Sequence, residues 1–97
     1  MTVGYVFTAS AQRDLVDIWE YIAVDNIDAA DAVIDEFEAA ARMLAELPLA
    51  GHVRNDLTDE PVRFWRVGRY LLVYLQGTRP VEIVRVLHGS RDVKESL

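Results

Sequence analysis

The segment VRFWRVGRYLLVYLQGTRPVEIVRVLH, residues 62–88, decides the fold of this chain. It contains three apolar runs rich in Val, Leu, Phe and Tyr, residue types that favour strands: 62–67, 70–76 and 81–88. Gly68 and Arg69 separate the first two runs, a spacing typical of a tight hairpin, and Gly-Thr-Arg-Pro separates the second run from the third. The segment therefore predicts three antiparallel strands in a meander.

The last two of these strands are apolar at nearly every position, which suits central strands covered by helices on one face and open to a further cover on the other. Alternation along the middle strand places Tyr70, Leu72, Tyr74 and Gln76 on one face and Leu71, Val73 and Leu75 on the other. We interpret the second set as core. Around the tyrosine face stand five arginines: Arg63, Arg66, Arg69, Arg85 and Arg91. Arginine beside aromatic rings binds bases, phosphates or acidic peptides, and it is equally common on an ordinary solvated sheet face.

Upstream of this segment the apolar residues change their period. Residues 3–8 alternate as in a short strand, and from Ala9 a helical stripe follows: Ala11, Leu15, Ile18, Trp19 and Ile22. Residues 25–28 supply a turn and a cap before a second helical stripe: Ala30, Val33, Ile34, Phe37, Ala41 and Leu44. Thr8 or Ser10 is the expected cap of the first helix, and Pro48 ends the second.

Two helices joined by so few residues must run antiparallel, as a helical hairpin. Residues 48–61 mix Pro, Gly, Asn and Asp with little periodicity and are predicted to form a loop. The order strand, helix, helix, strand, strand, strand predicts an α+β fold, β-α-α-β-β-β, in which an antiparallel sheet packs against the helical hairpin. With 97 residues and no linker or repeat, the chain is expected to be a single domain, 1–97.

The charge of the chain is divided between its two halves. Residues 1–62 carry 13 acidic and 3 basic side chains, whereas residues 63–97 carry 3 acidic and 7 basic ones. The net charge of −6 argues against sequence-independent attraction to nucleic acid or anionic lipid. Cysteine is absent, and no stretch resembles a signal peptide or a membrane span, so we expect a cytoplasmic protein.

Catalytic and metal-binding motifs are weak in this sequence. His88, Ser90 and Asp92 have the residue types of a hydrolase triad, but they share one strand end and no G-x-S-x-G turn exposes the serine. The two histidines, His52 and His88, lie in different segments, and the carboxylates fall mainly on outer helical faces. We predict no metal site and no cofactor.

Four stretches make the chain similar to a known family: SAQRDLVDIWEYIAVDN, AADAVIDEFEAAARMLAELPLAG, RVGRYLLVY and VEIVRVLHGSRD. In this order and at this spacing they resemble the RelE/ParE superfamily of toxins from type II toxin-antitoxin systems, and specifically its ParE branch. The resemblance covers nearly the whole chain. It implies the helical hairpin on a small sheet, and it matches His88, Arg91 and Asp92 to a family ending H-G-x-R-D that we interpret as structural.

The superfamily divides by target, and one position distinguishes the branches. ParE-like members poison DNA gyrase by binding and serve in plasmid stabilisation, whereas RelE-like members cut messenger RNA on the ribosome. RelE-like members carry an arginine in a strand pattern G-Y-R-L-V-Y, and this chain has Leu71 in that position. The resemblance therefore favours a gyrase-binding toxin without catalytic residues. The alternative is a messenger RNA endonuclease that would depend on these groups: Arg63, Arg66, Arg85, His88 and Arg91.

The resemblance also implies a partner. In this family an antitoxin segment wraps the toxin along its helices and sheet, so we expect a hetero-oligomer with a cognate antitoxin, and no membrane and no sequence-specific nucleic-acid partner. Our own choice of contact residues is the exposed aromatic and basic set: Trp19, Tyr21, Trp65, Arg66, Tyr70, Tyr74 and Arg91. A third alternative is an interaction module without toxicity.

Overall fold

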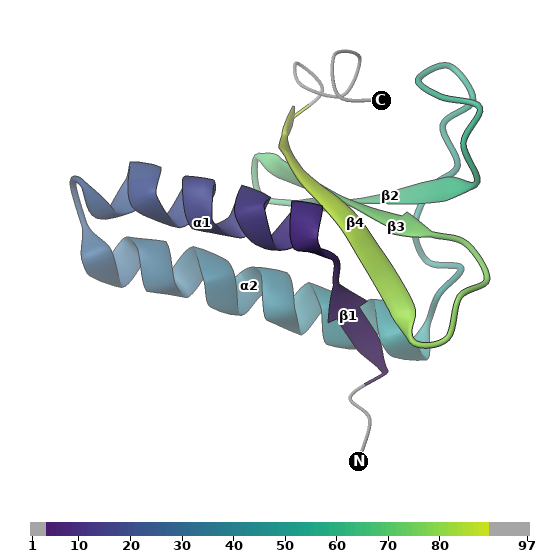
Figure 1. Ribbon diagram of the computed structural model, residues 1–97, viewed down its shortest axis with the longest axis horizontal. Coiled ribbons are helices and arrows are strands. Elements are labelled where there is room, and N and C mark those ends of the chain that lie inside the picture. Colours follow the sequence, from purple (N-terminus) through teal and green to yellow (C-terminus); the bar gives the residue numbers. More distant parts are fainter. Residues whose placement is uncertain (1–3, 90–97) are drawn as a thin grey trace.

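The computed structural model describes residues 4–89 and contains the predicted elements in the predicted order (Figure 1). They are β1 (Tyr5–Phe7), α1 (Ala9–Ala23), α2 (Ile27–Glu46), β2 (Val62–Val67), β3 (Tyr70–Leu75) and β4 (Val81–His88). The α+β class is confirmed, with the two helices side by side against the four-stranded sheet.

The sheet has the order β1-β4-β3-β2, and its pairing differs in one respect from the expectation. Strands β2, β3 and β4 form the predicted antiparallel meander, but β1 pairs in parallel with β4. The sheet is therefore mixed, and the prediction of a wholly antiparallel sheet was wrong. A tight hairpin forces its two strands to be antiparallel, whereas the long connection between β1 and β4 leaves the direction to packing.

Both helices begin at polar caps that the sequence indicates. The Thr8 side chain accepts a hydrogen bond from the Ala11 N–H at 3.3 Å, and the Asn26 side chain accepts one from the Ala29 N–H at 2.9 Å. Each cap satisfies a backbone donor that has no partner within the helix. The two caps fix where α1 leaves β1 and where α2 turns back.

The core lies between the helices and the tyrosine face of β3. Tyr70, Leu72 and Tyr74 pack there with Phe37 of α2, whose ring centroid is 5.4 Å from that of Tyr70. The opposite face of β3 carries Leu71 and Val73, which are buried in a second, smaller cluster. The prediction that Leu71 and Val73 belong to a core is confirmed, and the tyrosine face, which we had considered as a binding or solvated surface, is buried as well, beneath the helices.

The Tyr74 hydroxyl ties the loop after α2 to the sheet. It donates a hydrogen bond to the Pro48 carbonyl at 2.6 Å and accepts one from the Gly51 N–H at 2.9 Å. Gly51 is so close to the Tyr74 ring that a Cβ atom at this position would overlap it. The side chain is fully buried, so these two bonds replace the water that the hydroxyl would have in the unfolded chain.

The Asp14 carboxylate joins α1 to the edge of β4. Because β1 ends at Phe7, the Val86 N–H has no neighbouring strand to pair with, and it donates to Asp14 at 2.9 Å. The same carboxylate accepts two hydrogen bonds from the Arg85 guanidinium, at 2.8 and 3.1 Å. The Thr8 hydroxyl adds a bond of 3.2 Å to the Val84 carbonyl. The first turns of α1 thus take the place of a strand along β4.

We expect Tyr74→Phe to lower the free energy of unfolding by about 1–3 kcal/mol, because the substitution leaves the Gly51 N–H and the Pro48 carbonyl without their buried partner. Burial raises the pKa of the Tyr74 hydroxyl above its ordinary value of 10.0, against smaller opposing effects of the Gly51 hydrogen bond and of Arg63. This contribution to stability is complete below pH 10 and is lost as the pH rises through the folded-state pKa. Urea unfolding of the original protein and of Tyr74→Phe from pH 8 upwards measures the loss of stability and its pH dependence. If the difference in unfolding free energy between the two proteins did not change with pH, the predicted pH dependence would be contradicted.

We expect Asp14→Ala to cost about 2–3 kcal/mol of unfolding free energy, because it leaves the Val86 N–H and the Arg85 guanidinium half-buried without this acceptor. Asp17→Ala removes a carboxylate from an exposed position on the same helix and is the matched control. Thermal unfolding measures both. An equal, small effect of the two substitutions would mean that Asp14 does not join the helix to the sheet.

Candidate partner-binding site

The helical hairpin is longer than the sheet that it covers. α2 has 20 residues and β3 has 6, so the helix is roughly 30 Å long and the strand roughly 20 Å. The end of the hairpin where α1 meets α2 therefore projects beyond the strands, as Figure 1 shows. Apolar side chains on the inner faces of the helices have no strand above them at this end.

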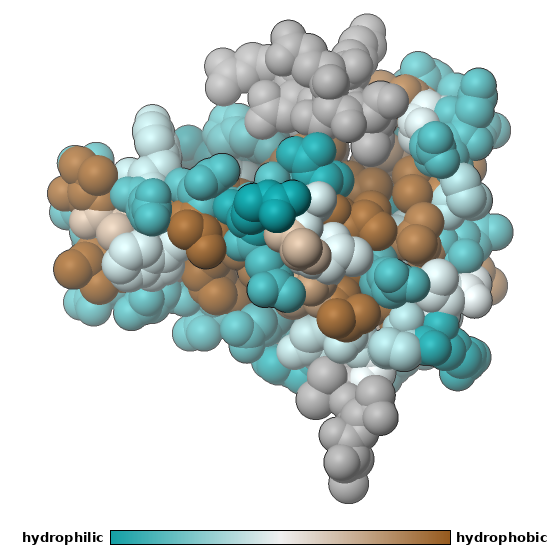
Figure 2. Space-filling model, in the orientation of Figure 1, coloured by the Kyte–Doolittle hydropathy of each residue, from teal (hydrophilic) through white to brown (hydrophobic). Residues whose placement is uncertain are grey.

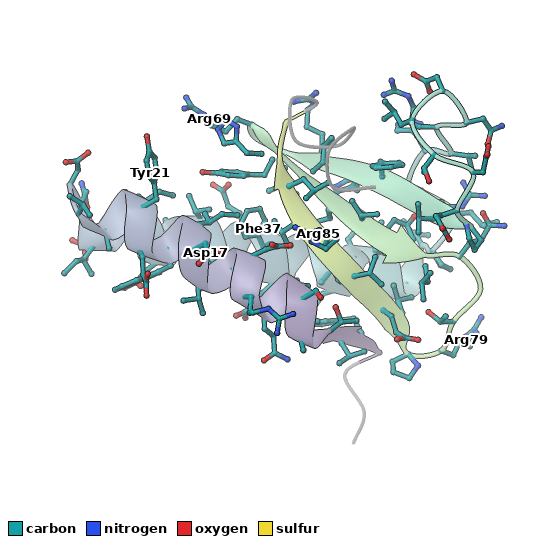
Figure 3. The ribbon with its side chains drawn as sticks, turned by 45° about the horizontal axis from the view of Figure 1, so that its top comes forward. Asp17, Tyr21, Phe37, Arg69, Arg79 and Arg85 are labelled. Atoms are coloured by element: carbon teal, nitrogen blue, oxygen red, sulfur yellow. The ribbon has the colours of Figure 1, made fainter. Side chains whose placement is uncertain are left out.

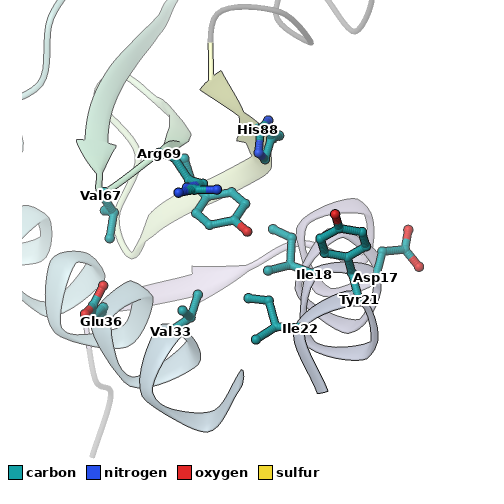
Figure 4. Close-up of a pocket in the computed structure, with 11 residues that line it drawn as sticks. Asp17, Ile18, Tyr21, Ile22, Val33, Glu36, Val67, Arg69 and His88 are labelled. Atoms are coloured by element: carbon teal, nitrogen blue, oxygen red, sulfur yellow. The ribbon is translucent and has the colours of Figure 1, made fainter. Parts of the chain in front are cut away.

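A hollow of about 750 Å³ lies where the sheet stops, and we call it the hairpin groove. Its lining comes from both helices, from the β2–β3 turn and from the end of β4 (Figure 4): Asp17, Ile18, Tyr21, Ile22, Val33, Glu36, Val67, Gly68, Arg69, Tyr70 and His88. The groove brings together segments that are far apart in the sequence.

The groove has an apolar interior and an aromatic lip. Ile18, Ile22 and Val33 line it from the helices and are partly buried. Tyr21 is 81% exposed, and Val24 at the hairpin turn is 84% exposed. Apolar surface therefore extends from the groove onto the tip of the hairpin, where Figure 2 shows hydrophobic residues at the surface. Surface of this kind favours a partner that covers it.

Charged groups stand on the walls of the groove. Asp17 of α1 and Glu36 of α2 are exposed on the helical walls, and Arg69 is exposed at the β2–β3 turn opposite them (Figure 4). The His88 ring packs edge-on against Tyr70, with ring centroids 5.3 Å apart. The helical side of the groove is thus acidic and the sheet side is basic. Figure 3 shows Arg69 and Arg79 at opposite ends of the sheet, so Arg79 does not add to this basic side.

The structure separates the predicted contact residues into buried and accessible ones. Tyr74 is fully buried and offers no surface to a partner, and Tyr70 is largely buried and lines the groove. The Trp19 indole N–H donates to the Asp31 carboxylate at 2.8 Å, so this side chain links α1 to α2. Tyr21 is the predicted contact that lies openly on the groove. Its role in binding stays a prediction.

Trp65 and Arg66 lie at a different place, on the edge strand β2. Together with His52 and Arg54 they line a second hollow of about 370 Å³. Arg54 is paired there with Asp56 at 2.8 Å. Arg91, the remaining predicted contact, lies outside the described residues, as do Ser90 and Asp92. Of the predicted contacts, Tyr21 and Tyr70 therefore lie at the hairpin groove, whereas Trp65 and Arg66 lie at this second hollow.

Four of the five groups of the alternative, catalytic prediction lie within residues 4–89, and these four do not converge on one point. The Arg63 guanidinium donates to the Gly51 carbonyl at 2.9 Å, and Arg85 is bound to Asp14. His88 stands opposite Tyr70, whereas Arg66 stands opposite Leu71 and so points to the other face of the sheet. Stabilising a phosphate in a transition state requires donors that are aimed together. The described side chains do not form such a set of donors.

Residues 4–89 contain no cluster of three His, Cys, Asp or Glu side chains that could hold a metal ion. No helix in this part of the chain is long and apolar enough to cross a membrane.

Sequence reasoning did not identify the groove. Ile18, Ile22 and Val33 were placed in the apolar stripes of the helices, and Ile18 and Val33 do pack against the core, but all three also line the groove. The length difference between α2 and the strands is the signal that could have found them, because a helix longer than its sheet must leave part of its apolar stripe uncovered.

Two of three comparisons with known proteins give a match, one to a fold and one to a family. No curated protein sequence matches the chain significantly. Among solved structures, a chain described as "Chromosomal ParDE TA system from P. aeruginosa" matches with a TM-score of 0.73 and 16% identity, covering 89% of this chain and 95% of that one. At this identity the match shows a shared fold. A family described as "ParE toxin of type II toxin-antitoxin system, parDE" matches residues 5–93. The chain belongs to the ParE toxin family of type II toxin-antitoxin systems.

Proposed function

We propose that this toxin acts by binding, that its target is DNA gyrase held in its cleaved-DNA state, and that a cognate antitoxin neutralises it. The chemistry then belongs to gyrase, and the toxin contributes surface. The observation that carries this proposal is the use of Arg63 and Arg85 within the fold, where they bind the Gly51 carbonyl and the Asp14 carboxylate.

Leu71 supports the same proposal. Messenger RNA-cutting relatives have an arginine at the corresponding place in their strand pattern. Here the leucine is 8% exposed and packs in the small apolar cluster with Phe64 and Leu87. A hydrocarbon side chain buried in this way cannot stabilise charge on a phosphate.

The charge of the protein argues in the same direction. An enzyme that works within ribosomal RNA gains affinity by releasing counterions through many basic contacts. This chain has an isoelectric point near 4.7, and its helices carry most of the acidic side chains. Such a surface is repelled by RNA phosphates.

The hairpin groove is our candidate for the antitoxin site. An antitoxin segment that folds on the toxin would cover Ile18, Ile22 and Val33 and would bury the exposed Tyr21 ring. The resulting complex is a hetero-oligomer, and we place it in the cytoplasm, where gyrase and its DNA are found. Release of the antitoxin would expose the groove again.

Purified protein, added to gyrase with ATP and supercoiled plasmid, is expected to cause linear, protein-linked DNA to accumulate. The same protein, added to a translating extract, is expected to leave messenger RNA intact. Cuts at codon positions without trapped DNA would support the endonuclease alternative. The absence of both activities would support a non-toxic interaction module.

His88→Ala is expected to keep gyrase trapping within about twofold of the original protein, because on this proposal His88 transfers no proton. Loss of the edge-on contact with Tyr70 is expected to lower the unfolding free energy by about 1 kcal/mol. Plasmid cleavage and thermal unfolding measure the two effects separately. Complete inactivation of a folded variant would instead indicate that His88 takes part in catalysis.

A further inference from the structure

We infer that the hollow on the edge strand β2, which we call the β2 hollow, binds an acidic segment of the target protein. Its lining is His52, Arg54, Phe64, Trp65, Arg66 and Leu71. This inference rests on the proposed function, in which the toxin acts by binding gyrase. It adds the surface that meets the target and the chemistry that the target must offer there, which is an apolar side chain flanked by carboxylates.

The rim of the β2 hollow is basic. His52, Arg54 and Arg66 are exposed there, and none of the described lining residues is acidic. This is the reverse of the chain as a whole, which has a net charge of −6. A carboxylate on a partner is attracted to such a rim, whereas the same carboxylate is repelled by the acidic outer faces of the helices.

Both arginines of the rim can exchange what they now hold for a partner's carboxylate. The Arg54 Nε and Nη2 groups donate to the two Asp56 oxygens at 2.9 and 2.8 Å, so this guanidinium already has the geometry that grips a carboxylate with two bonds. The Arg54 and Asp56 side chains are 47% and 63% exposed, and an ion pair so open to water contributes little to stability. Arg66 donates one long bond, of 3.4 Å, to the Gly68 carbonyl, which leaves most of its N–H donors for a partner.

The floor of the β2 hollow is apolar and firmly held. Phe64 and Leu71 are 3% and 8% exposed and belong to the second, smaller cluster. Two backbone hydrogen bonds of 2.8 Å between His52 and Phe64 fasten the loop to β2. Trp65, which is partly exposed, also lines the hollow. Tryptophan and arginine dominate binding energies at interfaces, and a site that is formed before the partner arrives spends less entropy on binding.

The distribution of charge favours a protein segment over a nucleic-acid strand. A strand carries a phosphate at every nucleotide and needs a basic track along its length. The β2 hollow offers two guanidinium groups, and residues 9–46, which include both helices, contain ten carboxylates against two arginines. A short acidic segment brings only the few carboxylates that the rim can pair, so it is attracted to the rim without this wider repulsion.

The β2 hollow is separate from the hairpin groove. The two share no described lining residue. Arg66 stands opposite Leu71 in the sheet, on the face that points away from Tyr70 and the helices. A segment that fills only the groove therefore leaves the β2 hollow accessible, and the two sites can serve two different partners.

Trp65 gives the β2 hollow an optical signal that tests the inference. Trp19→Phe leaves Trp65 as the one tryptophan of the chain, so its fluorescence reports on this site. The probes are two short peptides, each with one leucine flanked by glutamates or by glutamines, and an oligothymidylate. We expect the glutamate peptide to change the Trp65 emission at the lowest concentration, the glutamine peptide at a higher one, and the oligothymidylate to leave it unchanged.

A pair of charge-matched variants locates the effect. Arg54→Gln with Arg66→Gln removes two positive charges from the rim and is expected to weaken binding of the glutamate peptide about five- to tenfold. Arg13→Gln with Arg42→Gln removes two exposed positive charges from the helices and is expected to weaken it by less than about twofold. Both variants have the same net charge, and circular dichroism checks that both are folded.

Three results of the titrations would overturn the inference. Equal weakening by both variants would mean that the peptide responds to overall charge. Tighter binding of the oligothymidylate than of the glutamate peptide would make the occupant a nucleic acid. No response of Trp65 to the glutamate peptide would mean that no acidic segment enters the hollow.

Gyrase trapping is assayed separately on the same variants. The Arg54→Gln, Arg66→Gln protein is expected to need about five- to tenfold more protein for half-maximal trapping, and the control variant less than about twofold more. Equal trapping by both variants and the original protein would overturn the inference and leave the gyrase proposal intact. If the original protein does not trap gyrase, the gyrase proposal fails, and the peptide titrations alone decide what the β2 hollow binds.

Discussion

The structure depends on one carboxylate at the junction of its two layers. β1 is three residues long, and beyond Phe7 the edge of β4 has no strand beside it. Asp14 accepts the Val86 N–H and the Arg85 guanidinium there, so the first helix replaces a strand. Without this acceptor, a backbone donor and a cation would lose their shared partner at the layer junction.

This use of Arg85 limits what the sheet can do chemically. A guanidinium that holds a helix against a strand is not available to hold a phosphate, and Arg63 is bound to the Gly51 carbonyl in the same way. Leu71 is a hydrocarbon in the small cluster. The groove at the end of the hairpin is apolar inside and charged on its walls, and we propose it as the surface through which the toxin binds a partner.

The order of the elements could be predicted because each helix or strand has its own spacing of apolar residues and is bounded by turn or cap residues. The tight hairpin at Gly68, the caps at Thr8 and Asn26 and the meander all follow from local residues. The covered face of β3 could not be predicted in this way, because this strand is apolar on both faces and nothing local says which one the helices take. The Asp14–Arg85 pair joins residues 71 positions apart, and no local pattern indicates it. The groove follows from a difference in length between helix and strand, which was present in the sequence but was not used.

The most direct measurement compares Arg85→Ala with the original protein at a temperature where circular dichroism shows both to be folded. Each is assayed for trapping of gyrase on cleaved plasmid and for cutting of messenger RNA on ribosomes. If Arg85 serves the fold, gyrase trapping will follow the folded fraction, and neither protein will cut the transcript. If the original protein cuts the transcript and the folded variant does not, Arg85 acts on the phosphate, and the structural role that we assign to it is contradicted.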